Sequence, residues 1–425
     1  MNVELNGENP FFWHFLNLAL HLGAVVLLRV VLARLIPAPA AVVAAAIFAL
    51  HPFASEPVNY VFARGTLLCT LLCLASLNAW IRGHLWRAVL WFAAALLAKE
   101  ECVAFPALLT MLYFTTKRDP LQRMPIAVMF ALSLATGVHT IFVGIKTPGS
   151  GIATESGTTP GAYLLTQGEV ILRYFRLLVI PWGFTPDPDI HLATGWIPIA
   201  AWIVVLGLAV MAWNFRRAGF WFLAGLVLLL PSSSIFPAAD LAADRRMYFP
   251  MIAFSACIAL LLPKRPMVVV PILAILALLS FQRTLIWRTE ETLWTDAVEQ
   301  APSKIRPRLQ LARALPTDRG IALLEQIKPM APNDPRIAAE QGRLYLRAGN
   351  PQQALIEFGR ALALDPGSAS ALNNRAAALL AMGQTQAAVE DFQRALARDP
   401  CQMNARANLQ HLGIATAPPP ANCPQ

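Results

Sequence analysis

The stretch APAAVVAAAIFALHPFASEPVNYVFARGTLLCTLLCLASLNAWI, residues 38–81, places two long apolar runs on either side of a short polar connector. The connector, residues 51–65, brings a histidine, a glutamate, a tyrosine and an arginine between segments of almost pure hydrocarbon. A run of about 17–25 apolar residues is long enough to cross a bilayer as a helix. The stretch therefore predicts helices that cross a membrane, with a polar loop between them at its surface.

The composition divides the chain into an apolar and a polar part. Charged residues make up 14% of the sequence and hydrophobic residues 56%, whereas soluble globular proteins contain about 25% charged residues. Polar residues become frequent only after about residue 282. The net charge of +9 comes largely from short connectors between apolar runs, so it does not indicate nucleic acid as a partner. We expect a membrane domain over residues 1–286 and a soluble domain after it.

Hydropathy predicts an all-α, polytopic transmembrane bundle of about ten spans. The expected spans are residues 11–33, 38–54, 65–81, 85–98, 102–116, 124–145, 196–213, 220–237, 249–262 and 267–286. Residues 161–181 are apolar as well, but they carry Glu169, Arg173 and Arg176 near one helical face. We interpret this segment as an amphipathic helix on the membrane surface, the alternative being an eleventh span with its polar face packed inside the bundle.

The connectors alternate in charge, and this alternation predicts the orientation. Lys and Arg gather in every second connector, which the positive-inside rule assigns to the cytoplasm. These residues are Arg29, Arg34, Arg82, Arg87, Lys117, Arg118, Arg123, Arg216, Arg217, Lys264 and Arg265. The opposite connectors and everything after residue 286 should then lie outside. The abundance of Ala, Leu and Arg indicates a bacterial inner membrane with a periplasmic tail. The alternative is the endoplasmic reticulum membrane with a lumenal tail.

The polar tail contains a repeat of 34 residues. Gly349, Phe358 and Pro366 recur 34 positions later as Gly383, Phe392 and Pro400. A 34-residue unit of this kind is typical of the tetratricopeptide repeat, in which two antiparallel helices form one unit. We expect a connecting helix and a degenerate repeat over 287–332, full repeats over 333–366 and 367–400, and a capping helix with a Pro-rich tail over 401–425. Such units stack into a solenoid with a concave face, which predicts a groove for an extended peptide; a passive folded tail is the alternative.

The order of several stretches resembles that of the transmembrane-and-tetratricopeptide O-mannosyltransferases and their bacterial relatives, which have the C-type fold of glycosyltransferases that use lipid-linked sugars. The stretches are NPFFWHFLNLALH (9–21), HPFASEPVNYVFAR (51–64), LLAKEECVAFPALL (96–109), ADRRMYFP (243–250) and RTLIWRTEETLW (283–294). This sequence departs from the family in lacking a first span and an acidic outer loop ahead of residue 9, and Gly65 and Thr66 replace an acidic residue after the loop arginine. Either the chain is longer than this sequence, or this member lacks the catalytic loop and is inactive.

The resemblance implies transfer of a sugar from a polyprenyl-phosphate carrier in the membrane lipid to a protein or peptide acceptor held by the repeats. A fixed cation would stabilise the departing phosphate, and a carboxylate would accept the proton of the acceptor hydroxyl. The catalytic candidates are Glu56 and Asp244. The candidates for binding phosphate or substrate are Arg245, Arg246, Arg64, Lys99, Glu100, Tyr248 and His51. The alternative for the pairs Glu56–Arg64 and Asp244–Arg245 is that they only join loops.

Two other functions stay open at this point: a non-catalytic membrane scaffold whose repeats bind proteins, and a lipid-linked glycan ligase or polymerase. No metal site is assigned and no cofactor is certain, although two aspartates and a histidine in residues 183–195 leave assistance by a divalent metal open. Cys401 and Cys423 are the two cysteines of the soluble tail. If that tail lies outside the cytoplasm, we expect them to form a disulfide that closes a loop of about 20 residues.

Overall fold

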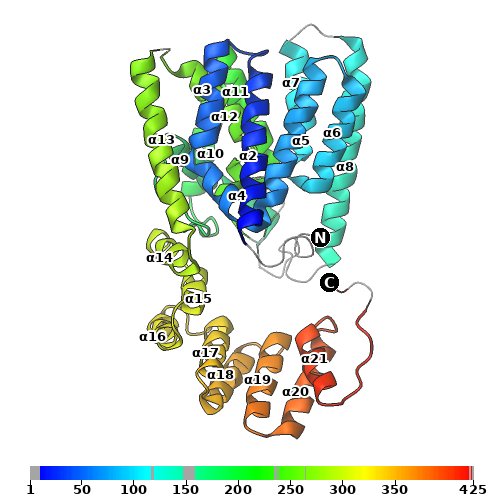
Figure 1. The fold of residues 1–425 in the computed structure, drawn as a ribbon, viewed down its shortest axis with the longest axis vertical. Helices are drawn as coiled ribbons and strands as arrows, with labels where there is room; N and C mark the ends of the chain where they lie inside the picture. Colours follow the sequence, from blue (N-terminus) through cyan, green and yellow to red (C-terminus); the bar gives the residue numbers. More distant parts are fainter. Residues whose placement is uncertain are drawn as a thin grey trace. The chain divides into compact units, whose positions relative to one another are not determined.

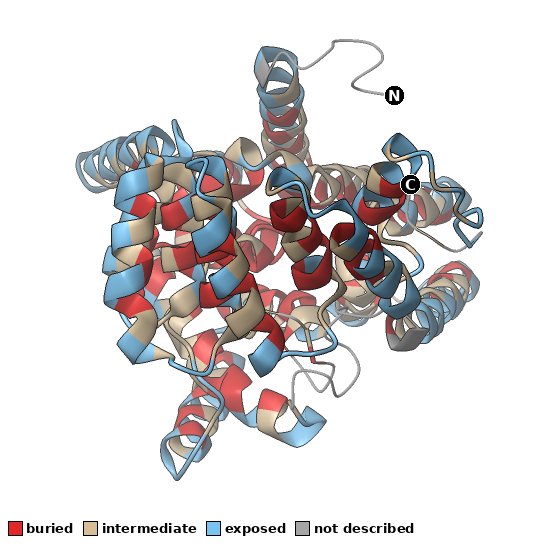
Figure 2. Ribbon diagram, turned by 90° about the horizontal axis from the view of Figure 1, so that it is seen from below, coloured by how far each residue is buried: buried red, intermediate tan, exposed pale blue. Residues whose placement is uncertain are grey.

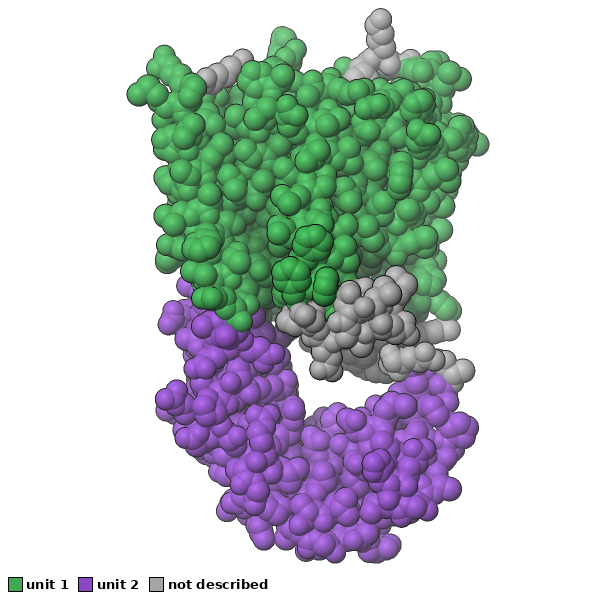
Figure 3. Space-filling view, viewed as in Figure 1, with its two compact units in different colours: residues 1–288 green, residues 289–425 purple. Residues whose placement is uncertain are grey.

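The computed structural model describes residues 10–115, 119–146, 158–233, 237–238, 240–263, 265–420 and 423. It divides into two compact units, unit 1 over Met1–Arg288 and unit 2 over Thr289–Gln425 (Figure 3). The boundary lies two residues after the one expected from composition. Every regular element in these described ranges is a helix, as the sequence predicts (Figure 1).

Unit 1 contains a helix in each of the ten apolar segments. These helices are α2 (Pro10–Leu32), α3 (Ala38–Leu50), α5 (Arg64–Ile81), α6 (Leu85–Ala98), α7 (Phe105–Thr115), α8 (Arg123–Lys146), α10 (Ile197–Trp213), α11 (Arg216–Leu229), α12 (Met251–Leu261) and α13 (Pro266–Ile286). The short helix α4 (Ser55–Asn59) follows α3, and α9 (Pro160–Val179) precedes α10. In Figure 1 the connections α2–α3 and α12–α13 lie at the upper end of unit 1 and α4 lies at its lower end.

Four of the described helices are long and apolar enough to cross a membrane: they span Phe11–Leu32, Val61–Ile81, Pro120–Gly144 and Pro266–Ile286. The bent pair Ala38–Leu50 and Pro52–Asn59 would make a fifth. Leu85–Ala98, Ile197–Trp213 and Met251–Leu261 are apolar but shorter. The protein thus has helices suited to a membrane, and the number ten stays a prediction.

The packing of unit 1 forms one apolar core and also leaves many large apolar side chains on the outside. Helix α12 is buried along nearly its whole length and contacts α3 and α11. Gly225 of α11 allows this contact, because a Cβ there would lie 2.6 Å from the Phe254 ring. Outward-facing side chains such as Val210 and Met267 are 73% and 89% exposed. An apolar exterior of this kind fits contact with lipid better than contact with water.

Helix α9 presents only part of its polar face to a surface, whereas the sequence predicted a surface helix. Tyr163, Tyr174 and Leu177 are buried, and the helix packs against α10. Arg173 points inward to Asp244, with 13% of its side chain exposed, whereas Arg176 is exposed. The expectation was wrong for Arg173 because a buried carboxylate 71 residues later in the chain holds its guanidinium.

Unit 2 is a stack of helix pairs that bends into an arc (Figure 3). Its helices are α14 (Glu290–Gln300), α15 (Ile305–Ala314), α16 (Thr317–Ile327), α17 (Pro335–Arg347), α18 (Pro351–Leu364), α19 (Ala369–Ala381), α20 (Thr385–Arg398) and α21 (Met403–His411). Helices α17–α18 and α19–α20 are the two expected repeats, and α21 is the capping helix. Gly349 and Gly383 join the helices of each repeat at φ +73° and +74°, a conformation that favours glycine. In Figure 2 the buried residues lie on helix faces turned toward other helices.

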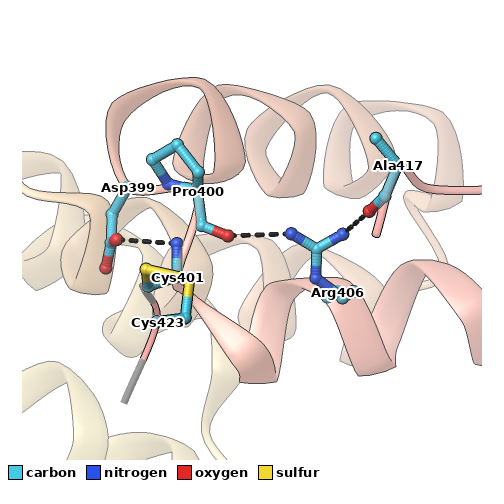
Figure 4. The surroundings of a disulfide bond; sticks show 6 residues. All are labelled: Asp399, Pro400, Cys401, Arg406, Ala417 and Cys423. Atoms are coloured by element: carbon cyan, nitrogen blue, oxygen red, sulfur yellow. Dashed lines mark hydrogen bonds between the residues drawn. A yellow bond between two sulfur atoms is a disulfide. The ribbon is translucent and has the colours of Figure 1, made fainter. Parts of the chain in front are cut away.

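A disulfide holds the end of unit 2. Cys401 and Cys423 are bonded with their Cα atoms 5.3 Å apart, which is the pairing expected from the sequence (Figure 4). Arg406 of α21 donates a hydrogen bond to the Pro400 carbonyl at 2.8 Å and another to the Ala417 carbonyl. The Pro-rich segment is thereby fixed along the capping helix.

Candidate functional site

The centre of the candidate site is Arg245, which lies between two carboxylates at one end of unit 1. It belongs to η7 (Asp244–Met247), a short helical turn between α11 and α12. Its Nη1 donates to Glu56 Oε1 at 2.9 Å, and its Nη2 donates to Asp240 Oδ2 at 3.0 Å. The Arg245 backbone N–H also donates to Glu56 Oε2 at 3.2 Å. Both carboxylates are thus drawn onto one guanidinium from separate parts of the chain.

The charge state of Arg245 follows from these contacts. Burial disfavours its charged form, but the neighbouring carboxylates of Glu56 and Asp240 outweigh this effect and raise the pKa of Arg245 above its ordinary value. Glu56 itself is 7% exposed, and Arg283 at the end of α13 is close enough for its charge to act on Glu56. The site therefore keeps a permanent cation beside a carboxylate that is largely removed from solvent.

Asp244 is a structural clamp and is not free to act as a base in this arrangement. Its carboxylate accepts two hydrogen bonds from Arg173 of α9 and a third from the Thr185 backbone N–H at 3.0 Å. It is 2% exposed. The alternative prediction from the sequence, an ion pair between Asp244 and Arg245, is wrong, because Arg245 pairs with Glu56 and Asp240 instead.

Arg246 is held mainly by backbone carbonyls and not by carboxylates. Its Nη2 donates to the Asp240 carbonyl at 2.7 Å, and its Nη1 lies 3.4 Å from the Leu241 and Ser232 carbonyls. It is 9% exposed. Carbonyl oxygens neutralise a guanidinium only partly, so an incoming anion would find positive charge here.

Lys99 forms a second polar group with Glu101 and Thr66. Its Nζ lies 2.6 Å from Glu101 Oε1 and donates to Thr66 Oγ1 at 2.7 Å. The structure therefore brings Glu101 to the lysine, whereas the predicted Glu100 is exposed. Both residues lie in η3 (Glu100–Ala104), and a turn of this short helix decides which of two adjacent glutamates faces inward.

Three further residues that the sequence predicted for the site form contacts within unit 1 that join its segments. Arg64 donates to Asn17 Oδ1 at 3.0 Å and lies over the Trp13 ring, so it joins α5 to α2 and does not pair with Glu56. His51 is buried, and its Nε2 lies 3.3 Å from the Leu178 carbonyl. Tyr248 is also buried, with its hydroxyl 2.8 Å from Nδ1 of His21. These contacts join separate segments of unit 1.

The site lies at the end of unit 1 where the chain leaves for unit 2. Ser55 of α4 approaches Ser280 of α13, with their Oγ atoms 3.3 Å apart. The rings of Tyr60 and Trp287 lie 6.1 Å apart. Since Trp287 directly follows α13, the Glu56–Arg245 group lies at the end of unit 1 that contains the last residues before unit 2.

Sequence reasoning missed Arg173 and Asp240 as members of the site. Both lie in segments that it had interpreted by charge alone, a surface helix and an outer connector. The described residues contain no group of three His, Cys, Asp or Glu side chains able to hold a metal ion. In the 183–195 segment, His191 Nε2 lies 3.1 Å from Asp189 Oδ1, an exposed pair.

The repeats of unit 2 provide the match to known proteins. Residues 369–400 match the tetratricopeptide repeat family. No curated protein is significantly similar to the chain. The matched segment contains α19 and α20, the second of the two predicted units, so the protein carries a repeat of a kind that binds other proteins. The match covers part of unit 2 and does not extend to unit 1.

Proposed function

We propose that the protein is a membrane glycosyltransferase that moves a sugar from a polyprenyl-phosphate carrier to a protein acceptor held by the tetratricopeptide repeats. The observation that carries this proposal is the Glu56–Arg245–Asp240 group. It joins a permanent cation and a shielded carboxylate in a unit with apolar helices suited to lipid. The ordered resemblance of five stretches to the O-mannosyltransferases supports the same reaction.

In this proposal Arg245 is the group that first meets the carrier phosphate. A phosphate draws a guanidinium into a bidentate contact, so the Arg245 fork would turn from Glu56 to the donor. Glu56 would then be free to accept the proton of an acceptor hydroxyl, while the cation stabilises the charge on the departing phosphate. Arg246 supplies further positive charge, and Asp244 positions η7 by its contact with Arg173.

The disulfide of unit 2 supports a proposal for the compartment that this unit faces. Unit 2 contains a disulfide, and disulfides persist in oxidising compartments. We infer that unit 2 and the Glu56–Arg245 group face the periplasm of a bacterial inner membrane, with the endoplasmic reticulum lumen as the eukaryotic equivalent. The acceptor would then be an exported protein.

A non-catalytic scaffold is the second candidate, because Arg245, Arg173 and Lys99 all have carboxylate partners within the protein. Charges paired in this way can serve only to join loops. In that case the repeats would bind envelope proteins and unit 1 would anchor them.

Transfer of radiolabelled mannose from a polyprenyl-phosphate donor to outer-side proteins, using the purified full chain, tests the first candidate. Glu56→Gln is expected to lower the rate about 10²–10⁴-fold, the usual contribution of a general base. The double variant Arg245→Ala, Arg246→Ala should be inactive as well. Glu169→Gln removes a carboxylate outside the group and should keep the wild-type rate. Full transfer by Glu56→Gln would exclude its role, and capture of proteins without any transfer would favour the scaffold.

A further inference from the structure

A groove with a volume of about 660 Å³ lies on unit 1 between α2, α5 and α6. Polar side chains form its rim at the α5–α6 connection, and apolar side chains form its floor. The rim consists of Asn78, Arg82, His84 and Arg87. The floor consists of Leu27, Ala75, Ala79, Leu90, Trp91 and Ala94. The groove lies away from the Glu56–Arg245 group and has no part in the proposed transfer.

The rim is positively charged and lacks neighbouring acids in the sequence. None of the described lining residues is acidic, and no Asp or Glu occurs between Glu56 and Glu100. Arg82 donates from Nε to Asn78 Oδ1 at 3.2 Å, a neutral partner that fixes the guanidinium without cancelling its charge. Arg82, His84 and Arg87 are all exposed. The rim therefore offers two exposed cations and an imidazole to an anion.

The groove changes from charged to apolar along the helix axes. Arg87 and Ala94 are seven residues apart on α6, which corresponds to about 10 Å at the rise of an α-helix. The same interval separates Ala75 of α5 from Arg82, which directly follows that helix. Trp91 lines the groove at 42% exposure, and tryptophan is enriched at the boundary between lipid headgroups and hydrocarbon. This gradient matches the phosphate and the first part of an acyl chain of one phospholipid.

We propose that this groove binds one anionic glycerophospholipid, with its phosphate between Arg82 and Arg87 and an acyl chain along Ala75 and Ala94. A zwitterionic lipid would bring its own ammonium group toward a positive rim, so the charge favours a lipid with net negative charge. A free phosphate would leave the apolar floor uncovered. Basic residues beside membrane helices attract anionic lipids in the cytoplasmic leaflet, which is where the positive-inside rule places this connector.

Native mass spectrometry of the full chain in detergent, titrated with phosphatidylglycerol or phosphatidylcholine, tests the proposal. Phosphatidylglycerol should bind preferentially, with one molecule held more tightly than the rest. The double variant Arg82→Ala, Arg87→Ala should weaken this binding about 30-fold, as expected for two arginines beside a lipid surface. The matched control, Arg217→Ala with Arg265→Ala, removes two exposed arginines from other connectors and should bind as the wild type does.

A second variant separates a lipid from a free anion. Ala94→Phe fills the floor and keeps both arginines, so it should displace phosphatidylglycerol while leaving any binding of inorganic phosphate unchanged. Equal binding of the two lipids, wild-type binding by the double arginine variant, or displacement of phosphatidylglycerol by millimolar inorganic phosphate would each overturn the proposal. Thermal unfolding of every variant checks that it is folded, and the arginine pair decides the question if Ala94→Phe is not.

Discussion

Asp244 shows how much of unit 1 depends on a single buried carboxylate. It accepts hydrogen bonds from Arg173 and from the Thr185 backbone, and these contacts join η7 to α9 and to the segment that follows α9. Removing one partner of a buried ion pair leaves the other charge uncompensated, at a cost of about 3–5 kcal/mol. The role of Asp244 is therefore to hold Arg245 and Arg246 in place.

Asp244→Asn should lower the stability of unit 1 by about 3 kcal/mol, because Arg173 would stay buried without a negative partner. Thermal unfolding of the purified chain in detergent measures the effect. Glu169→Gln on the same α9 helix removes a partly exposed carboxylate and should change stability by no more than about 0.5 kcal/mol. Equal melting temperatures for the two variants would contradict the clamp.

At this scale the sequence drew attention to charged residues of unit 1 but did not predict their partners. Glu56, Asp244 and Arg245 stand out because charge is rare in an apolar chain. Their partners depend on tertiary contacts, since 189 residues separate Glu56 from Arg245 and 71 separate Arg173 from Asp244. No local pattern contains that information, so the sequence did not predict Arg173 and Asp240 as members of the site. For the same reason it predicted Glu100 as a site residue, whereas Glu101 is the one that faces inward.

The apolar helices were predicted well in position and less well in length. Residues 220–237 were expected as one span, whereas α11 covers Arg216–Leu229 and ends before Pro231. Similarly, α7 begins only at Phe105, because η3 occupies the residues before it. Hydropathy measures how apolar a segment is, and it does not register where the backbone changes from one helix type to another.

The repeat helices were predicted with bounds close to those observed, because their spacing is a sequence property in itself. Packing within the repeat adds a requirement that spacing does not show. Gly342 of α17 faces the Phe358 ring of α18, and a Cβ there would lie 2.6 Å from it. Gly359, also within α18, has no atom within 4 Å of the position that a Cβ would take. The two glycines thus have different reasons to be present.

Gly342→Ala should destabilise unit 2 by about 1–3 kcal/mol, because the methyl group forces the two helices of the repeat apart. Gly359→Ala should instead stabilise it by about 0.5–1 kcal/mol, since alanine favours a helix interior more than glycine does. Urea unfolding followed by circular dichroism on residues 289–425 measures both changes. Stabilisation by both substitutions would show that Phe358 does not pack as described.

At the scale of the whole molecule, the chain runs from the candidate site in unit 1 directly into the repeats of unit 2. Helix α13 ends beside α4, and unit 2 begins at Thr289. In the proposed membrane topology, the candidate site and the repeats therefore lie on the same side. The sequence predicted this side from its charged connectors, and the cysteines give an independent way to measure it.

In its native membrane, the protein should hold Cys401 and Cys423 as a disulfide, while Cys69, Cys73, Cys102 and Cys257 stay reduced. The bond closes a loop between residues 22 positions apart, and it should add about 3 kcal/mol by restricting the unfolded chain. The other four cysteines are buried in unit 1 and form no disulfide.

Differential alkylation measures the redox state of all six cysteines. The protein in its membranes is denatured in the presence of a first alkylating reagent, then reduced, and then treated with a second reagent before mass spectrometry. The first label should appear on the four cysteines of unit 1 and the second on Cys401 and Cys423. In Cys423→Ser, Cys401 should take the first label instead. If both tail cysteines of the wild type carry the first label, the disulfide is absent from the native protein, and the proposal of an oxidising compartment for unit 2 loses its support. The same result would weaken the outer location proposed for the Glu56–Arg245 group, because this group lies at the end of unit 1 from which unit 2 emerges.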